Sequence, residues 1–170
     1  MFGRDRKQMP QETAGSSELL IDVRRMSKIY NEGRENEVRA LDDISLTVPW
    51  GEFLCILGQS GSGKSTLMNI LGCLDIPTYG TYYLNGQAVS DMKPSTLSGI
   101  RNREIGFIFQ GFNLIPALTA VENVELPLIY RGMGREERHA LAVEALRSVG
   151  LEKRMQHRPN EMSGGQQQRV

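Results

Sequence analysis

The sequence has no excess of charge of either sign and no long apolar run. Its 170 residues include 20 Lys and Arg and 20 Asp and Glu, so the formal net charge is zero. This balance gives no electrostatic basis for binding nucleic acid or a membrane surface. No apolar run approaches the roughly 20 residues that a membrane-spanning helix needs, and the N-terminus lacks the apolar core of a signal peptide. We therefore expect no nucleic-acid partner, and we expect any membrane contact to be made through another protein.

Cysteine and histidine are also scarce. The two cysteines, Cys55 and Cys73, both lie in apolar periodic segments, and no C-x-x-C pair occurs. We expect both to be small buried hydrophobic residues of a protein in a reducing cytosol. The two histidines, His139 and His157, stand apart in the chain, so the sequence predicts no metal cluster and two solvated side chains.

Glycine, in contrast, gathers in one loop. Residues 58–66 read G-Q-S-G-S-G-K-S-T and fit the pattern G-x-x-x-x-G-K-S/T. An apolar run at residues 53–57 precedes the loop and predicts a strand buried on both faces. Apolar residues at 67, 70, 71 and 74 follow it with the spacing of a helix that has one buried face. Strand, glycine loop and helix in this order are the context in which the pattern indicates a phosphate site.

The residue types of this loop suit a triphosphate. Glycine lets backbone amides approach a phosphate without a Cβ in the way, and amides at a helix N-terminus attract anions. Lys64 is predicted to reach the β- and γ-phosphates, and the Ser65 hydroxyl is predicted to bind Mg²⁺. The alternative is a flexible Gly/Ser loop before a helix, which the flanking segments disfavour. The predicted nucleotide-binding residues are Gly58, Gln59, Ser60, Gly61, Ser62, Gly63, Lys64, Ser65 and Thr66.

Strand signals lie on both sides of the loop. Residues 1–18 are polar and predict a disordered lead, after which apolar and polar residues alternate over 19–30 and 43–48. Residues 81–84, Asn85-Gly86 and residues 88–89 predict a hairpin. A second continuous apolar run, at 105–109, predicts another strand buried on both faces, and together with residues 53–57 it suggests a parallel core.

Helix signals follow mainly in the second half. Residues 94–103 suit a short amphipathic helix, and Thr119-Ala120-Val121-Glu122 is a capping box that opens a helix through about Leu128, ended or kinked by Pro127. Residues 134–149 predict another helix, which Gly150 caps. The predicted buried face of that helix consists of Leu141, Ala142, Ala145, Leu146 and Val149. The mixture of strands and helices predicts an α/β fold.

Two further motifs carry polar groups at the end of a predicted strand and at the start of a predicted helix. Gln110 directly follows the predicted strand at 105–109, and ligands of α/β sheets gather beyond the carboxyl ends of strands. Residues 163–169, S-G-G-Q-Q-Q-R, place a serine and two glycines before a polar helix start, where exposed amides suit an anion. An ordinary loop glutamine and an ordinary capped helix remain open as alternatives.

Together these stretches resemble a known family. G-Q-S-G-S-G-K-S-T, F-I-F-Q-G-F-N-L-I-P and M-S-G-G-Q-Q-Q-R-V resemble the nucleotide-binding domain of ABC (ATP-binding cassette) transporters. K-I-Y, A-L-D-D-I-S-L and L-T-A-V-E-N-V-E-L-P-L further resemble the branch of macrolide exporters, lipoprotein-releasing ATPases and the cell-division ATPase. The resemblance implies a P-loop NTPase fold with an antiparallel β subdomain and ATPase core over residues 19–110, and a helical subdomain with the signature motif over residues 111–170.

The resemblance also implies roles for single residues. Tyr30 corresponds to the aromatic residue that stacks on adenine, although a core strand residue is an alternative for it. Gln110 corresponds to the glutamine that binds Mg²⁺ and senses the γ-phosphate, so Lys64 and Gln110 are the expected catalytic residues. Phe112–Ile115 would lie where the ATPase meets a membrane permease, and exposed apolar side chains suit such docking.

The signature residues would act on a second subunit. Ser163, Gly164, Gly165 and Gln166 would contact the γ-phosphate of the ATP that a second, head-to-tail copy holds. The implied protein is a homodimeric ATPase that uses ATP and Mg²⁺. It would lie in the cytoplasm, peripheral to the inner membrane, and couple hydrolysis to export by the permease.

Some features of the family are not found. The sequence stops at Val170, within the signature helix, before the acidic strand that would supply an aspartate for Mg²⁺ and the catalytic glutamate, and before a later histidine. We therefore expect these residues to be the N-terminal part of a longer ATPase, truncated before that strand and inactive alone. The alternatives are a cell-division ATPase of the same family that signals without moving a substrate, a cassette protein of repair or translation, and a P-loop kinase or GTPase. The compact segment between Gln110 and Ser163 disfavours the repair and translation proteins, and the S-G-G-Q motif disfavours the kinases and GTPases.

Overall fold

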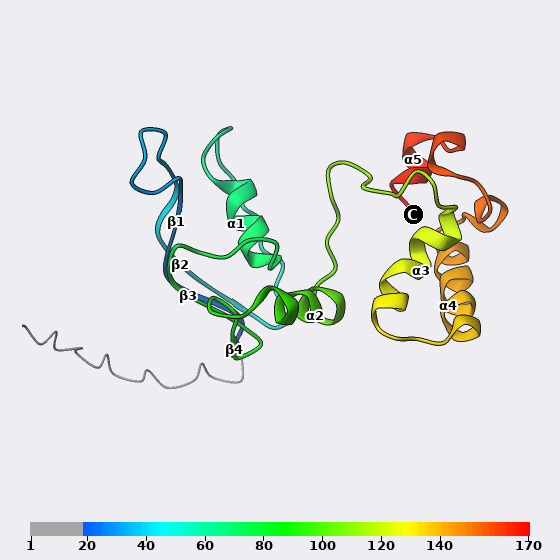
Figure 1. Ribbon diagram of the computed structural model, residues 1–170, viewed down its shortest axis with the longest axis horizontal. Coiled ribbons are helices and arrows are strands. Elements are labelled where there is room, and N and C mark those ends of the chain that lie inside the picture. The colour runs from blue at the N-terminus through cyan, green and yellow to red at the C-terminus, as the bar shows by residue number, and fades with distance from the viewer. Residues whose placement is uncertain (1–18) are drawn as a thin grey trace, which may run out of the picture. The chain divides into compact units, whose positions relative to one another are not determined.

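The computed structural model describes residues 19–170, which divide into two compact units (Figure 1). The first unit ends at Arg101 and the second begins at Asn102. The predicted disordered lead, residues 1–18, lies outside the described residues. The boundary expected between residues 110 and 111 from the family resemblance stays a prediction.

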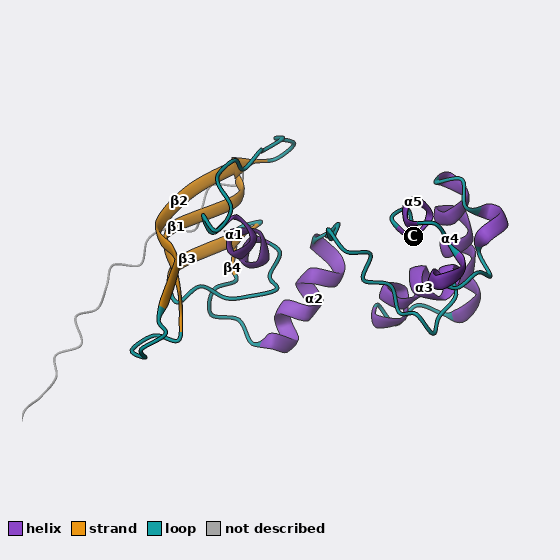
Figure 2. Cartoon of the chain, turned by 90° about the horizontal axis from the view of Figure 1, so that it is seen from above, coloured by secondary structure: helices purple, strands orange, loops and turns teal. Residues whose placement is uncertain are grey.

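The first unit is built on a four-stranded antiparallel sheet (Figure 2). Its strands, in the spatial order β2-β1-β3-β4, are β1 (Leu19–Tyr30), β2 (Val38–Pro49), β3 (Tyr79–Leu84) and β4 (Gln87–Ala88). Both strands predicted from alternation are confirmed, and β2 already begins at Val38. Asn85 and Gly86 have φ angles of 49° and 73°, as a two-residue hairpin turn of this kind requires, so the predicted hairpin is confirmed.

Helix α1 (Lys64–Leu71) packs on this sheet. Leu67 and Ile70 are buried on its inner face, and the buried Tyr82 of β3 donates its hydroxyl hydrogen to the Leu71 carbonyl oxygen at 2.9 Å. Leu74 was expected on the same face but is exposed. The reason is that the helix ends at Leu71, so the later residue no longer follows the helical repeat.

The two apolar runs predicted to be buried strands are not strands. Residues 53–57 and 105–109 form no regular element, and Phe53 and Ile108 are 92% and 86% exposed. Within residues 19–170 no neighbouring strand pairs with either run, so their backbone groups have no ladder and their side chains no covering layer. The expected parallel core is therefore absent from the described residues, and the only sheet in them is antiparallel.

The two cysteines differ in burial, because only one of them lies in a segment that other residues cover. Cys73 follows α1 and is buried, which raises the pKa of its thiol, so the expectation of a buried hydrophobic residue is confirmed there. Cys55 lies in the uncovered run and is exposed, so the same expectation is wrong for it.

The second unit is helical. Helix α2 (Pro94–Glu104), which matches the predicted amphipathic helix, begins in the first unit and ends in the second. The second unit further contains α3 (Ala120–Tyr130), α4 (Arg135–Ser148) and the short α5 (Gly164–Gln167). Two 3-10 turns, Glu152–Arg154 and Pro159–Glu161, lie between α4 and α5. The core of this unit consists of Ala120, Val121, Ala142, Leu146, Leu151 and Met162.

The N-terminus of α3 is held at several points. The Thr119–Glu122 capping box is present, as predicted. The amides of Ala120 and Val121 donate to the carbonyl oxygens of His157 and Met155 at 2.8 and 3.0 Å, which ties the later loop to this helix end. Pro127 does not end the helix, which continues to Tyr130, two residues beyond the expected end near Leu128.

Helix α4 buries a narrower face than its sequence predicts. Ala142 and Leu146 are buried, but Leu141, Ala145 and Val149 are exposed, since this helix packs chiefly on α3 along one narrow face. Gly150 ends it as predicted, with a φ of +73°.

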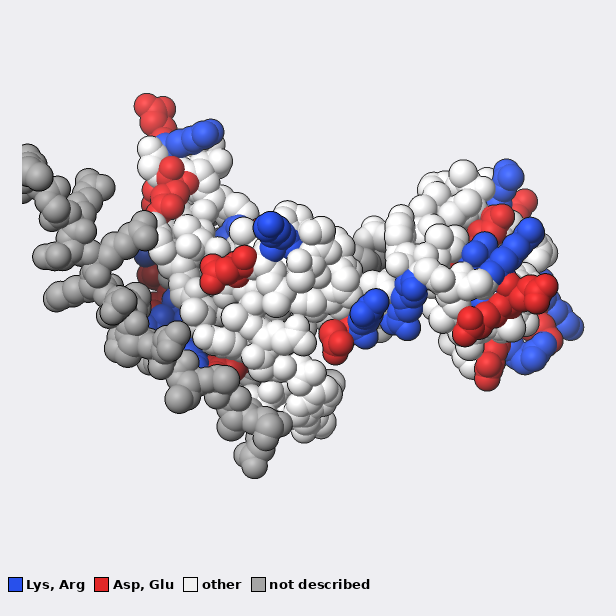
Figure 3. Space-filling model, turned by 60° about the horizontal axis from the view of Figure 1, so that its bottom comes forward, with Lys and Arg blue, Asp and Glu red and all other residues white. Residues whose placement is uncertain are grey.

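Charged side chains of both signs intermingle on the second unit (Figure 3). One exposed example is the ion pair between Arg147 Nε and Glu152 Oε1 at 3.2 Å. Within residues 19–170, no helix combines the length and the apolar character that a membrane span requires.

Candidate functional site

The glycine loop and the first turn of α1 surround an open hollow of about 480 Å³ in the first unit. Its lining residues all belong to the predicted phosphate site and are Ser60, Gly61, Gly63, Lys64, Ser65 and Thr66.

Gly63 joins the loop to the sheet. Its φ is +87°, in the left-handed region, and it is the N-cap of α1. A Cβ at this position would overlap the Ala40 carbonyl oxygen and come within 3.0 Å of Leu41 Cδ2, both on β2. Only glycine lets the loop turn into the helix while its backbone rests against the strand.

The first turn of α1 presents free amides. The first intrahelical bond runs from the Leu67 amide to the Gly63 carbonyl oxygen at 2.8 Å. In the described part of the chain, the amides of Lys64, Ser65 and Thr66 have no acceptor. Three unpaired N–H groups at the positive end of a helix dipole favour an anion.

Lys64 lies over the same loop. Its ammonium group donates to the carbonyl oxygens of Gly58 and Gln59 at 2.7 and 2.5 Å. An ammonium group has three N–H donors, so these two contacts leave one donor for a ligand. The loop thus holds a positive charge beside the free amides.

The donors fit a magnesium ion that accompanies a phosphate ligand. Mg²⁺ is usually held by one or two protein groups together with substrate phosphates and water. The Ser65 hydroxyl is exposed and makes no hydrogen bond within residues 19–170, so it is available as one ligand. No group of three His, Cys, Asp or Glu side chains in this range forms a separate metal site. Gln110 is exposed and belongs to the second unit, and its role stays a prediction.

Tyr30, the predicted base-stacking residue, stands at the end of β1 with 37% of its surface exposed. Its hydroxyl donates to Asp75 Oδ2 at 3.1 Å, and Lys28 Nζ lies 5.0 Å from its ring centroid. Neither Lys28 nor Asp75 was predicted from the sequence as a site residue. Strand alternation places Lys28 on the same face as Tyr30 and could have indicated it, whereas no sequence signal pointed to Asp75.

The signature residues cap α5. The Ser163 hydroxyl accepts from the Gln166 amide at 3.4 Å, and Gln166 Oε1 accepts from the Ser163 amide at 2.9 Å. The glycines between them, Gly164 and Gly165, are exposed, while the preceding Met162 is buried in the core of the unit. The motif is therefore anchored by Met162 and exposed at its glycines. Its contact with a second subunit stays a prediction.

The predicted docking loop lies in the same unit as the signature residues. Phe112 and Ile115 are both exposed, and Phe112 Cζ lies 3.5 Å from where a Cβ on Gly164 would be. Asn123 of α3, which was not predicted from the sequence as a site residue, fixes the loop. Its Oδ1 accepts from the Ile115 amide at 2.8 Å, and its Nδ2 donates to the carbonyl oxygens of Leu118 and Thr119 at 3.2 and 2.9 Å.

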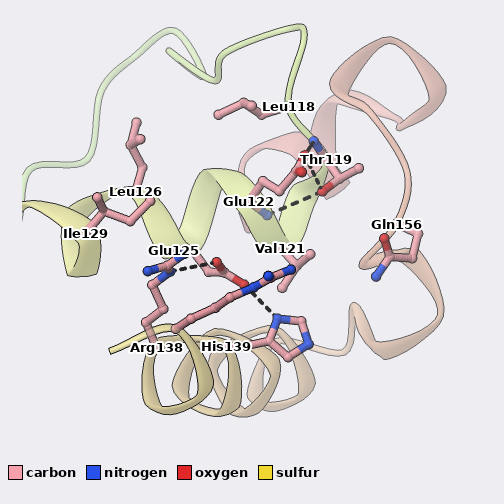
Figure 4. A pocket seen from close by; sticks show the side chains of 11 residues that line it. Leu118, Thr119, Val121, Glu122, Glu125, Leu126, Ile129, Arg138, His139 and Gln156 are labelled. Atoms are coloured by element: carbon pink, nitrogen blue, oxygen red, sulfur yellow. Dashed lines mark hydrogen bonds and ion pairs between the residues drawn. The ribbon is translucent and has the colours of Figure 1, made fainter. Parts of the chain in front are cut away.

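A second hollow, of about 510 Å³, lies beside α3 and α4 (Figure 4). In it Glu125 of α3 accepts from Arg138 Nε at 3.1 Å and contacts His139 Nδ1 at 2.6 Å. Burial raises the pKa of the Glu125 carboxyl, but the bonds from His139 and Arg138 outweigh it and hold the pKa below its usual value. His139 is exposed but paired, so the expectation of a merely solvated histidine is incomplete.

The contacts of Glu125 with Arg138 and His139 should contribute to the stability of the second unit. Glu125→Gln should lower the free energy of unfolding by about 2 kcal/mol at pH 7, because a carboxylate that is only 12% exposed loses its ion pair with Arg138 and its contact with His139. A depressed pKa stabilises the fold above the unfolded pKa, near 4.3 for glutamate, and this stabilisation disappears as pH falls through the folded pKa. Urea unfolding at neutral and acidic pH measures both effects.

The control for this variant is Glu152→Gln, which breaks the exposed pair with Arg147. It should change the free energy of unfolding by less than about 0.5 kcal/mol. Equal effects of the two substitutions would show that the Glu125 contacts do not hold α3 to α4.

Comparisons with known proteins identify the family and support the fold. The family model described as ABC transporter matches residues 41–170, well over half of the chain. The chain belongs to the ABC transporter family. The fold class expected from the sequence, an α/β ATPase of the ABC type with an antiparallel sheet and a helical part, is therefore confirmed.

Individual ABC proteins are similar over most of the chain. The chain is 51% identical to the macrolide export ATP-binding/permease protein MacB of Hyphomonas neptunium over 151 residues, which are 89% of this chain and 23% of that protein. It is 52% identical to the ABC transporter ATP-binding protein YknY of Bacillus subtilis and 56% identical to one of Thermotoga maritima, covering 65% and 63% of those proteins. It thus spans less than a quarter of the first relative and just under two-thirds of the other two.

Solved ABC cassettes have the same fold. Two structures of the bacterial cassette MJ0796, both described as dimeric and one as bound to ADP and Pi after hydrolysis, align with a TM-score of 0.80 and 48% identity. Each alignment covers 88% of this chain and 66% of the other.

Proposed function

We propose that the chain is the ATP-binding and ATP-hydrolysing part of an ABC transporter that drives export through a membrane permease. The observation that carries the proposal is the cradle of residues 58–66, where three unpaired amides, an ammonium group and a free hydroxyl surround one hollow. A nucleoside triphosphate with its magnesium ion would supply the negative charge and the oxygen acceptors that match these donors.

Each residue of the cradle has a separate task in the proposal. The amides of Lys64, Ser65 and Thr66 bind phosphate oxygens, and Lys64 turns its free donor toward the β- and γ-phosphates. The Ser65 hydroxyl ligates Mg²⁺, which neutralises charge on the phosphates. Gln110 orients water and ligates the same ion. Tyr30 stacks on the base, which needs a partly exposed ring of the kind found at the end of β1.

Two protein partners complete the proposal. Ser163, Gly164, Gly165 and Gln166 of a second copy cover the γ-phosphate, which the exposed position of Ser163 and the two glycines favours, and the similar solved cassettes are described as dimeric. Phe112–Ile115 docks on the permease from the cytoplasmic side, which is supported by the exposed Phe112 and Ile115 and by the relative named as a macrolide export ATP-binding/permease protein.

The proposal is tested by adding MgATP to the protein that carries this chain. Nucleotide uptake by titration calorimetry and a doubling of mass by light scattering are the expected results, and AMP should give neither. Ser163→Arg should abolish the mass change by placing a bulky cation at the signature, and it should leave nucleotide uptake per monomer intact because Ser163 is not one of the residues that line the cradle.

The matched control is Ser148→Arg, which puts the same side chain at the exposed end of α4 and should not affect the dimer. No uptake at millimolar ATP by the unaltered protein would overturn the proposed function. A normal dimer of the Ser163→Arg variant would overturn the role of the signature residues in it.

A further inference from the structure

Three side chains near the end of β1 form one connected group. Asp75, in the loop after α1, accepts from Lys28 Nζ at 2.7 Å through Oδ1 and from the Tyr30 hydroxyl at 3.1 Å through Oδ2. Lys28 Nζ also donates to the Ile76 carbonyl oxygen at 2.8 Å and lies 5.0 Å from the Tyr30 ring centroid. The ring is therefore held at its hydroxyl end by a carboxylate and over one face by a cation.

The group is sheltered rather than loosely solvated. The side chains of Lys28 and Asp75 are 11% and 28% exposed. Burial raises the pKa of the Asp75 carboxyl, but the hydrogen bonds from Lys28, the Ile76 amide and Tyr30 outweigh it and hold the pKa below its usual value. The carboxylate thus stays charged and keeps its three partners throughout the neutral range.

The same strands carry the phosphate cradle. Lys28 on β1 is paired with Leu41 on β2, and Leu41 is one of the two residues against which Gly63 rests. On the other side of the group, Thr78 Oγ1 accepts from the Ile29 amide at 2.9 Å, which pins the loop that carries Asp75 to β1. A group that fixes Tyr30 here therefore fixes it relative to the loop that would hold the phosphates.

We propose that Asp75, held in place by Lys28, is a positioning residue that fixes the Tyr30 ring so that the face opposite Lys28 receives the adenine base. The inference rests on the proposed function, because it concerns the base of the nucleotide bound at residues 58–66. Its specific consequence is that Asp75 contributes to binding of the base and not to binding of the phosphates. A ring that is already oriented loses less conformational freedom when the base stacks on it.

The test compares ATP with inorganic tripolyphosphate, which has the phosphates but no base. Asp75→Asn should weaken ATP binding about fivefold, a part of the full value of base–aromatic stacking, and should leave tripolyphosphate binding within about twofold. Tyr30→Phe, which keeps the ring and loses its hydroxyl, should weaken ATP binding similarly. The double variant should be little weaker than either single variant, because the two substitutions remove the same contact.

Controls separate the failure of this inference from the failure of the proposed function. Asp42→Asn, which alters the exposed pair with Arg39 on β2, should affect neither ligand. ATP binding unchanged in Asp75→Asn, or an equal loss for ATP and tripolyphosphate, would overturn the positioning role while leaving the cradle in place. Failure of the unaltered protein to bind either ligand would instead overturn the proposed function itself.

Discussion

Replacing Lys64 with alanine should weaken ATP binding by about 100-fold while leaving the first unit folded. Charge-assisted hydrogen bonds from an ammonium group to phosphate are worth about 1.5–3 kcal/mol, and each 1.4 kcal/mol corresponds to a factor of ten. The fold should survive because the two acceptors of Lys64, the carbonyl oxygens of Gly58 and Gln59, lie on an exposed loop and can turn to water. Titration calorimetry with MgATP and thermal unfolding measure the two quantities.

The matched control removes the same charge elsewhere on the first unit. Lys93→Ala, at an exposed position just before α2, should bind ATP as the unaltered protein does. ATP affinity of Lys64→Ala within threefold, about 0.7 kcal/mol, of the unaltered protein would contradict the cradle as the nucleotide site.

Gly63→Ala should destabilise the first unit by about 3 kcal/mol or more and also abolish ATP binding. Its φ of +87° disfavours any Cβ by about 1 kcal/mol or more. In addition, the new methyl group would overlap the Ala40 carbonyl oxygen, which is backbone and cannot rotate away. Relief of the clash must move either β2 or the N-terminus of α1, and the second movement takes the amides of Lys64, Ser65 and Thr66 out of position. Urea unfolding and ATP titration measure the result.

Gly33→Ala is the control for backbone conformation. Gly33 also has a positive φ, +73°, but a Cβ there meets nothing within 4 Å. Its substitution should cost about 1 kcal/mol from the left-handed backbone alone and leave ATP binding unchanged. If Gly63→Ala were no more destabilising than Gly33→Ala, the close approach of the loop to β2 would not be what requires glycine.

Features that depend on neighbouring residues were predictable. The Asn85-Gly86 turn needs two positive φ angles and has them, and the capping box of Thr119 and Glu122 forms within one turn of helix. The glycine loop belongs to this class, because its glycines, Lys64 and the following helix lie within one short stretch. In each case the sequence already contains both partners of the interaction.

Features that depend on a distant partner were not predictable. A run such as residues 53–57 becomes a buried strand only where another strand pairs with it, and none does in the described residues. Leu141 looks like a core residue by helical spacing, yet it is 43% exposed. The spacing of apolar residues shows which face of an element is able to be buried, but not whether a partner is present.

By itself, the sequence determined the family of this protein, the glycine loop and the positions of most helices and strands, because these follow from short-range chemistry and from the order of motifs along the chain. Only the tertiary structure decided how the site is supported. It showed that Gly63 rests on Ala40 and Leu41, that Asn123 holds the Ile115 loop, and that Asp75 joins Lys28 to Tyr30. The physical reason is that a hydrogen bond or a close contact between residues far apart in sequence exists only once the fold has brought them within a few ångströms, and no local pattern records that distance.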